Sequence, residues 1–152
     1  MTQQLSWRNF PACGPIPPHL ENALIERLQV PGAPQPAGPY STAVRAGDFL
    51  FISGQGPVDA SGEMQASASI GEQTRLVLHN LETILRGCGS GPEDVVKCSV
   101  FLLDAKDFDA MNAVYAGFFG ENKPARTTVA TGMVAEGMKV EIDCVAYLPR
   151  SA

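Results

Sequence analysis

The segment MKVEIDCVAYLP, residues 138–149, alternates between apolar and mixed side chains. One set of alternate positions is apolar and comprises Met138, Val140, Ile142, Cys144 and Ala146. The other set includes charged groups and comprises Lys139, Glu141, Asp143, Val145 and Tyr147. Because successive side chains of a strand point to opposite faces, the segment is predicted to be a β-strand with one buried face. Glu141 is predicted to lie on the other face.

A second strand is predicted in KPARTTV, residues 123–129, because three of its residues in a row are β-branched. Arg126 lies at its start and has two interpretations. It is a surface residue paired with an acid, the usual case, or its guanidinium binds a ligand carboxylate through two hydrogen bonds. If this strand and residues 138–149 form a hairpin through GMVAEGM, residues 132–138, Arg126 and Glu141 approach each other.

Glu141 also has two interpretations. It is a carboxylate on a wet sheet face, which the pattern alone favours. If that face lines a cleft between subunits, the carboxylate can orient a water molecule or transfer a proton. The segment SGQGP, residues 53–57, follows an apolar run, and its glycines permit close approach of the backbone to a ligand.

The remaining elements indicate the fold class. Two strands are predicted in residues 41–55 and a long one in residues 91–105. Apolar side chains at helical spacing predict helices in residues 69–89 and 108–120. The order strand-strand-helix-strand-helix-strand-strand predicts an α+β fold, a mixed sheet with both helices on one face. The other face then needs a cover, which oligomerisation can supply.

The N-terminal part differs from the rest. Residues 1–38 are predicted to be an arm rich in proline and glycine, and residues 39–152 a single domain. Within the arm, PHLENALIERLQV, residues 18–30, places leucines and an alanine at helical spacing, which predicts a short amphipathic helix. The arm is expected to pack on the domain or on a neighbouring subunit.

Composition excludes several classes of function. The net charge is −5 and no Lys/Arg cluster occurs, which disfavours nucleic-acid binding. The four cysteines form no CxxC pair and only two histidines are present, so no metal site is predicted. The cysteines are interpreted as small buried hydrophobic residues in a reducing compartment. No signal sequence or membrane-spanning stretch is found, and a cytoplasmic location is predicted.

Six segments together resemble the RidA/YjgF family of imine deaminases. In the family's order they are GPYS (38–41), ISGQGPV (52–58), VVKCSVFLLD (95–104), FDAMNAVYAGFF (108–119), PARTTV (124–129) and KVEID (139–143). The resemblance implies a chorismate-mutase-like fold and a homotrimer with three clefts between subunits. It also implies hydrolysis of 2-imino acids, the tautomers of enamines, to 2-keto acids and ammonia without a cofactor.

The resemblance also assigns roles to residues. Arg126 matches the arginine that binds the substrate carboxylate, and Glu141 matches the acid that positions water. The expected substrate-binding positions are Tyr40, Ser53, Gly54, Asn112 and Thr128. Thr128 stands where many members carry a cysteine, which argues against thiol-dependent chemistry there and is expected to alter substrate preference.

Two alternatives to a general deaminase follow from the same residues. One is a pathway-specific deaminase that acts on a particular enamine or aminoacrylate in a catabolic route. The other is a trimer without turnover that binds a ligand or acts like a chaperone. Activity on a panel of enamine acids separates these hypotheses.

Overall fold

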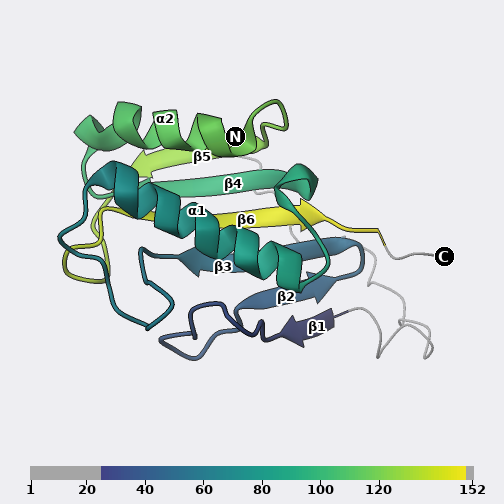
Figure 1. The fold of residues 1–152 in the computed structure, drawn as a ribbon. Coiled ribbons are helices and arrows are strands. Elements are labelled where there is room, and N and C mark those ends of the chain that lie inside the picture. Colours follow the sequence, from purple (N-terminus) through teal and green to yellow (C-terminus); the bar gives the residue numbers. More distant parts are fainter. Residues whose placement is uncertain (1–24, 150–152) are drawn as a thin grey trace, which may run out of the picture.

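The computed structural model describes residues 25–149, which form a six-stranded mixed sheet with two α-helices (Figure 1). The strands are β1 (Ile25–Leu28), β2 (Ala43–Ala46), β3 (Phe49–Gln55), β4 (Val95–Leu102), β5 (Ala125–Ala130) and β6 (Val140–Tyr147). The helices are α1 (Ile70–Gly87) and α2 (Phe108–Phe119). Short 3₁₀ turns precede β4 at Pro92–Asp94 and α2 at Ala105–Asp107. The strand order is β1-β2-β3-β6-β4-β5. The predicted mixed sheet is confirmed.

Helix α1 begins where the sequence supplies a capping box. The Glu72 amide donates to Ser69 Oγ at 3.3 Å, and the Ser69 amide donates to the Glu72 carboxylate at 2.8 Å. These two bonds satisfy N–H groups that a helix start otherwise leaves unpaired. The helix buries one apolar stripe against the sheet, made of Val77, Leu78, Leu81, Ile84 and Leu85. Each such side chain stabilises the fold by about 1.5–3 kcal/mol.

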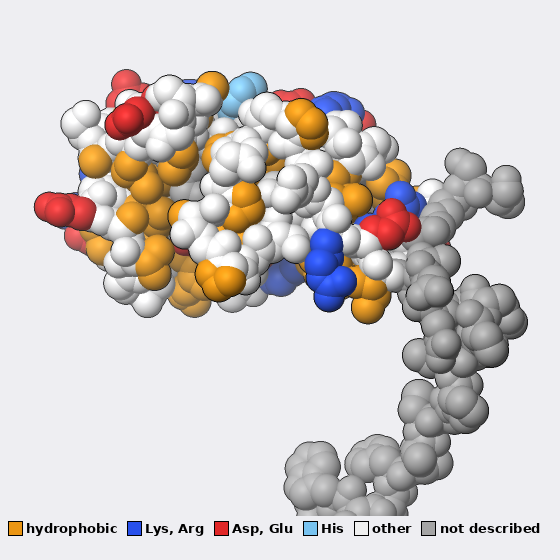
Figure 2. Space-filling model, turned by 90° about the horizontal axis from the view of Figure 1, so that it is seen from below, with side chains coloured by type: hydrophobic (Ala, Val, Ile, Leu, Met, Phe, Trp, Pro, Cys, Tyr) orange, Lys and Arg blue, Asp and Glu red, His pale blue; other side chains and the backbone are white. Residues whose placement is uncertain are grey.

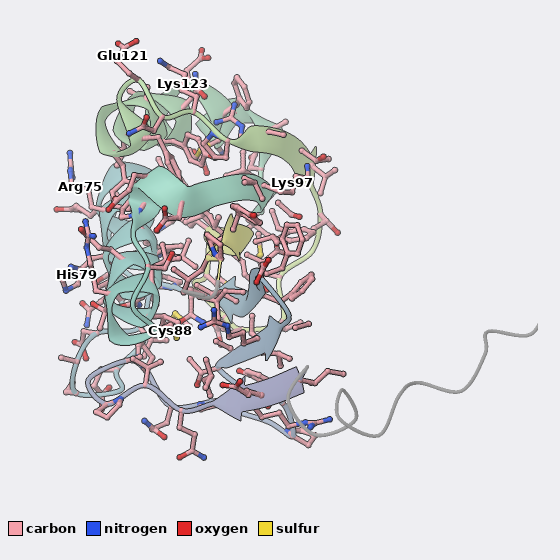
Figure 3. The ribbon with its side chains drawn as sticks, turned by 90° about the vertical axis from the view of Figure 1, so that its right-hand side faces the viewer. Arg75, His79, Cys88, Lys97, Glu121 and Lys123 are labelled. Carbon is pink, nitrogen blue, oxygen red and sulfur yellow. The ribbon has the colours of Figure 1, made fainter. Side chains whose placement is uncertain are left out.

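Both helices lie on one face of the sheet, as predicted (Figures 1 and 3). Strand β6 is central, between β3 and β4, and it runs antiparallel to both. Its apolar set from Val140 to Ala146 is buried beneath the helices, whereas Glu141, Asp143 and Val145 are half-buried on the other face. The predicted division of this segment into two faces is confirmed.

The face away from the helices, called the open face here, carries large apolar side chains. Phe49 on β3 pairs with Tyr147 on β6, and their rings lie 5.5 Å apart. Phe51 on β3 is 47% exposed. Ile25 lies on the same face, on the edge strand β1, and is 60% exposed. Lys97 points to this side in Figure 3, opposite Arg75 and His79 on the helical side. Such a patch is typical of an interaction surface.

The predicted helix in the arm is wrong for residues 25–28. These residues form β1, which pairs with β2 so that Ile25 lies opposite Ala46 and Leu28 opposite Ala43. An isolated helix shorter than about 12–15 residues is marginal in water, whereas the sheet edge supplies hydrogen bonds to the backbone of residues 25–28. The remainder of the predicted helix, residues 18–24, lies outside the described residues.

The hairpin that would bring Arg126 and Glu141 together, stated above as a condition, does not form. Strand β5 pairs with β4 in parallel, and β4 lies between β5 and β6. The reason is the connection between β4 and β5, because a helix that crosses over a sheet returns the chain parallel to its first strand. Residues 131–139 then carry the chain past β4 to the centre of the sheet.

Candidate active site

Arg126 occupies the second position of β5, the edge strand, on the helical face of the sheet. Its guanidinium carbon lies 4.5 Å from the centre of the Tyr115 ring and 5.7 Å from that of Phe108, both on α2. A hollow of about 290 Å³ surrounds it and is lined also by Asn112, Ala116, Lys123 and Pro124. We call this group the arginine site. It holds two cationic side chains and no acidic one.

The guanidinium of Arg126 has no acidic partner among residues 25–149. It makes no hydrogen bond or ion pair there, although the chain as a whole carries a net charge of −5. The usual interpretation, a surface arginine paired with an acid, therefore does not apply within the described part of the subunit. The five N–H donors of the group stay available for an anion.

Glu141 lies on the opposite face, against the backbone of β3. A Cβ atom at position 54 would overlap Glu141 Oε1, so glycine at this position is what allows the carboxylate to lie there. Burial raises the pKa of Glu141 above its ordinary value, and the negative charge of nearby Asp143 adds to the increase. A carboxyl group with a raised pKa exchanges protons more readily near neutral pH.

A cleft of about 440 Å³ opens beside Glu141, and we call it the glutamate cleft. Tyr40, Ser53 and Gly54 line it, with an apolar wall that includes Val58, Met64, Pro34, Pro36, Val134 and Met138. Ser53 Oγ donates to the Ser41 carbonyl at 2.7 Å, and the Tyr40 hydroxyl accepts from the Ala37 amide at 3.1 Å. Figure 2, a view from below, shows hydrophobic side chains gathered at the left, the end at which β3 finishes in Figure 1.

The predicted site residues lie at separate places in the chain. Tyr40, Ser53, Gly54 and Glu141 share the glutamate cleft, whereas Asn112 shares the arginine site with Arg126. The Cα partners of Arg126 and Glu141 on β4 are Cys98 and Phe101. Cys98 and Phe101 are three positions apart on β4, which is about 10 Å along the strand. Strands β5 and β6 are two strand spacings apart, about 9.6 Å. The Cα atoms of Arg126 and Glu141 are therefore about 14 Å apart.

Thr128 lies two residues beyond Arg126, in a neighbouring hollow lined also by Leu102, Phe108 and Asp109. Its Oγ1 atom is buried without a hydrogen-bond partner in the described chain. No sequence pattern points to Lys123 or to the two rings as parts of the arginine site. Phe108 and Tyr115 lie on the apolar stripe of the predicted second helix, where the pattern indicates only core packing.

Residues 25–149 include three of the four cysteines and both α-helices. Cys98 and Cys144 lie opposite each other on β4 and β6, and both are buried free thiols, as predicted. Burial raises the pKa of Cys98 to about 11. Within residues 25–149 no cluster of three potential metal ligands occurs, and no helix there is long and apolar enough to cross a bilayer.

These features define a class of protein: an α+β domain with a cationic site at the edge of its sheet and an acidic cleft on the opposite face. Residues 31–148 match the family model described as endoribonuclease L-PSP. A RutC family protein of Pyrococcus horikoshii is 46% identical over 115 residues, which cover 76% of this chain and 91% of that protein.

Two further relatives extend the comparison. The mitochondrial protein mmf2 of Schizosaccharomyces pombe is 45% identical over 112 residues, covering 72% of this chain and 87% of that protein. The crystal structure of E. coli TdcF with bound serine has a TM-score of 0.75 at 35% identity, covering 83% of this chain and 99% of that chain. The chain belongs to the RidA/YjgF family, whose members also carry the names RutC and endoribonuclease L-PSP. Because some relatives are mitochondrial, the cytoplasmic location stays a prediction.

Proposed function

We propose that this protein hydrolyses small 2-imino acids to 2-keto acids and ammonia without a cofactor. One observation carries the proposal: Arg126 presents a guanidinium without an acidic partner in the described part of a negatively charged chain. Such a group is suited to bind a carboxylate through two parallel hydrogen bonds. The bound serine in the TdcF structure supports a small amino-acid-like ligand.

The chemistry needs orientation and proton transfer. Arg126 holds the substrate carboxylate, and Glu141 accepts a proton from a water molecule whose oxygen adds to C2 of the imine. Glu141 passes this proton to the imine nitrogen, which gives a neutral carbinolamine. Glu141 then accepts the hydroxyl proton as the C2 carbonyl forms and the C–N bond breaks with its electron pair on nitrogen. The nitrogen takes that second proton and leaves as ammonia, so one water is consumed and Glu141 returns to its carboxylate. The raised pKa of Glu141 favours this two-way proton transfer.

The two groups act on one substrate only if the site is shared between subunits. In one chain they lie on opposite faces of the sheet and on strands separated by β4. We therefore propose that the homotrimer indicated by the family resemblance brings Arg126 of one subunit to the glutamate cleft of the next. The apolar open face supports this assembly, since side chains such as Phe51 and Tyr147 are left exposed by a lone subunit.

The first test measures ammonia and 2-oxobutanoate release from 2-iminobutanoate that a pyridoxal-phosphate dehydratase generates in situ. Wild type is compared with Arg126→Ala, Glu141→Gln and a buffer-only reaction. Fast release that is lost in both variants supports the proposal. A trimeric wild type that only matches the buffer rate contradicts the general deaminase, and a panel of larger enamine acids then tests the pathway-specific alternative.

A second test examines the shared site. Arg126→Ala and Glu141→Ala proteins are unfolded, mixed in equal amounts and refolded together. In random trimers about a quarter of the shared sites receive both natural residues, so about a quarter of wild-type activity should return. No recovery in mixed trimers of confirmed composition contradicts a site that combines Arg126 and Glu141 from different subunits.

A further inference from the structure

Two aromatic rings are the described neighbours that hold the Arg126 guanidinium. Tyr115 lies 4.5 Å from it and is only 5% exposed, whereas Phe108 lies 5.7 Å away and is 39% exposed. Both rings come from α2, seven residues apart, so they lie on one side of the helix two turns from each other. Their π faces attract a cation that lies within about 6 Å of the ring centre.

The two rings restrict the Arg126 guanidinium before an anion binds, and this lowers the entropy cost of binding. A free arginine side chain loses considerable rotamer entropy when a ligand fixes it. A carboxylate partner would fix it in advance but would use its N–H donors and neutralise its charge. Rings restrict the guanidinium through its face and accept no conventional hydrogen bond, so the N–H groups stay available to the ligand.

Tyr115 is itself firmly held. Its ring packs against Phe119 at 4.6 Å, and Phe119 packs edge-on against Phe118 at 4.9 Å. Burial raises the pKa of the Tyr115 hydroxyl, which lies beside the Cys98 thiol, so the phenol stays neutral and offers no competing anion to Arg126. The ring is therefore a fixed, uncharged support.

We propose that Tyr115 and Phe108 are positioning residues that hold the Arg126 guanidinium ready for the substrate carboxylate. This inference rests on the proposed role of Arg126 as the carboxylate-binding group. It assigns a binding function to a helix stripe that otherwise contributes packing, and it makes Tyr115 the stronger contributor, because its ring is nearer and excludes water more completely.

The experiment compares kcat, KM and the Kd for 2-oxobutanoate in the full-length protein. Tyr115→Leu is expected to raise KM and Kd by about 5- to 30-fold, and Phe108→Leu by about 2- to 5-fold, with smaller changes in kcat. Tyr115→Phe keeps the ring and is expected to restore most of the affinity that Tyr115→Leu loses. Val114→Ala is the control, since it removes apolar bulk from the same helix and Val114 does not line the arginine site.

The outcomes separate the inference from the proposed function. If wild type is active and Arg126→Ala is inactive, but both leucine variants keep the wild-type KM and Kd, the positioning role is refuted and the proposed function stands. If Tyr115→Phe loses as much affinity as Tyr115→Leu, the hydroxyl matters rather than the ring, and the inference fails. If wild type is inactive and does not bind 2-oxobutanoate, both fail. Should Tyr115→Leu not fold, the half-exposed Phe108 decides the question alone.

Discussion

Replacing Gly54 with alanine should remove activity while leaving the fold intact. Position 54 does not have a positive φ, so the backbone itself accepts alanine. The added Cβ would overlap Glu141 Oε1 and would lie 2.8 Å from Cδ and 3.1 Å from Cγ of the same side chain. Since real Cβ atoms essentially never lie as close to another atom as this one would to Oε1 and Cδ, either Glu141 rotates away or β3 and β6 move apart.

The size of the loss in kcat depends on whether the Glu141 side chain or the backbone of the two strands moves. Overpacking a rigid core costs about 1–3 kcal/mol, but Glu141 is half-buried and borders an open cleft, so the side chain can move at lower cost. A displaced carboxylate no longer reaches the water molecule, and general acid–base catalysis contributes about 10²–10⁴-fold to a rate. We therefore expect Gly54→Ala to lower kcat about 100-fold or more.

The assay pairs ammonia release with thermal unfolding, and the chain offers a matched control. Gly117 lies inside α2, and a Cβ there meets no atom within 4 Å. Gly117→Ala should keep its activity and gain about 0.5–1 kcal/mol of helix stability. If Gly54→Ala stays fully active while Glu141→Gln is inactive, the placement of the carboxylate against residue 54 is not what catalysis requires, and the reasoning is refuted.

Four other measurements test the structure. The kcat/KM of wild type should fall as the pH drops through the raised pKa of Glu141, at a higher pH than for an ordinary glutamate; an unchanged profile in Glu141→Gln would contradict this. Because that folded-state pKa exceeds the unfolded value, ionisation of Glu141 lowers stability as pH rises, so Glu141→Gln should unfold at higher temperature than wild type at pH 7 but not at pH 3. Ser69→Ala removes the capping box and should lower the unfolding free energy by about 1 kcal/mol in denaturant titrations, with activity retained. In native protein at pH 8, a thiol reagent should label Cys88 before the buried Cys98, as mass spectrometry of peptides can show.

The sequence predicts the faces of elements better than it predicts their partners. The alternation in residues 138–149 and the apolar stripe of α1 are periodic patterns, and burial in the structure follows both. Pairing depends on long-range topology, which periodicity does not contain. Periodicity therefore left open whether the last two strands form a hairpin, and in the structure β4 lies between them. The helix prediction is wrong for residues 25–28 because their backbone forms hydrogen bonds with β2 at the sheet edge, and helical spacing of apolar residues does not reveal this pairing.

For the candidate site too, the sequence predicts which residues take part but not which residues they contact. Residue types and the family resemblance predict Arg126 and Glu141, and the structure gives each a distinct environment. The sequence does not reveal that the arginine is held by rings instead of an acid. An aromatic residue on a helix stripe has the same pattern whether it packs on leucine or on a guanidinium. Only the position of β5 beneath α2 distinguishes these possibilities.

The environments of the two groups explain why assembly and activity should be linked. Glu141 is half-buried on a face that a lone subunit leaves open, and a neighbour that covers this face would desolvate the carboxylate further and raise its pKa more. Arg126 lies on an edge strand, where its charge can reach beyond its own subunit. A polar substitution on the open face, such as Phe51→Glu, should therefore abolish assembly and activity together. Arg126→Ala leaves that face unchanged and should abolish activity alone, as sedimentation of both variants can test.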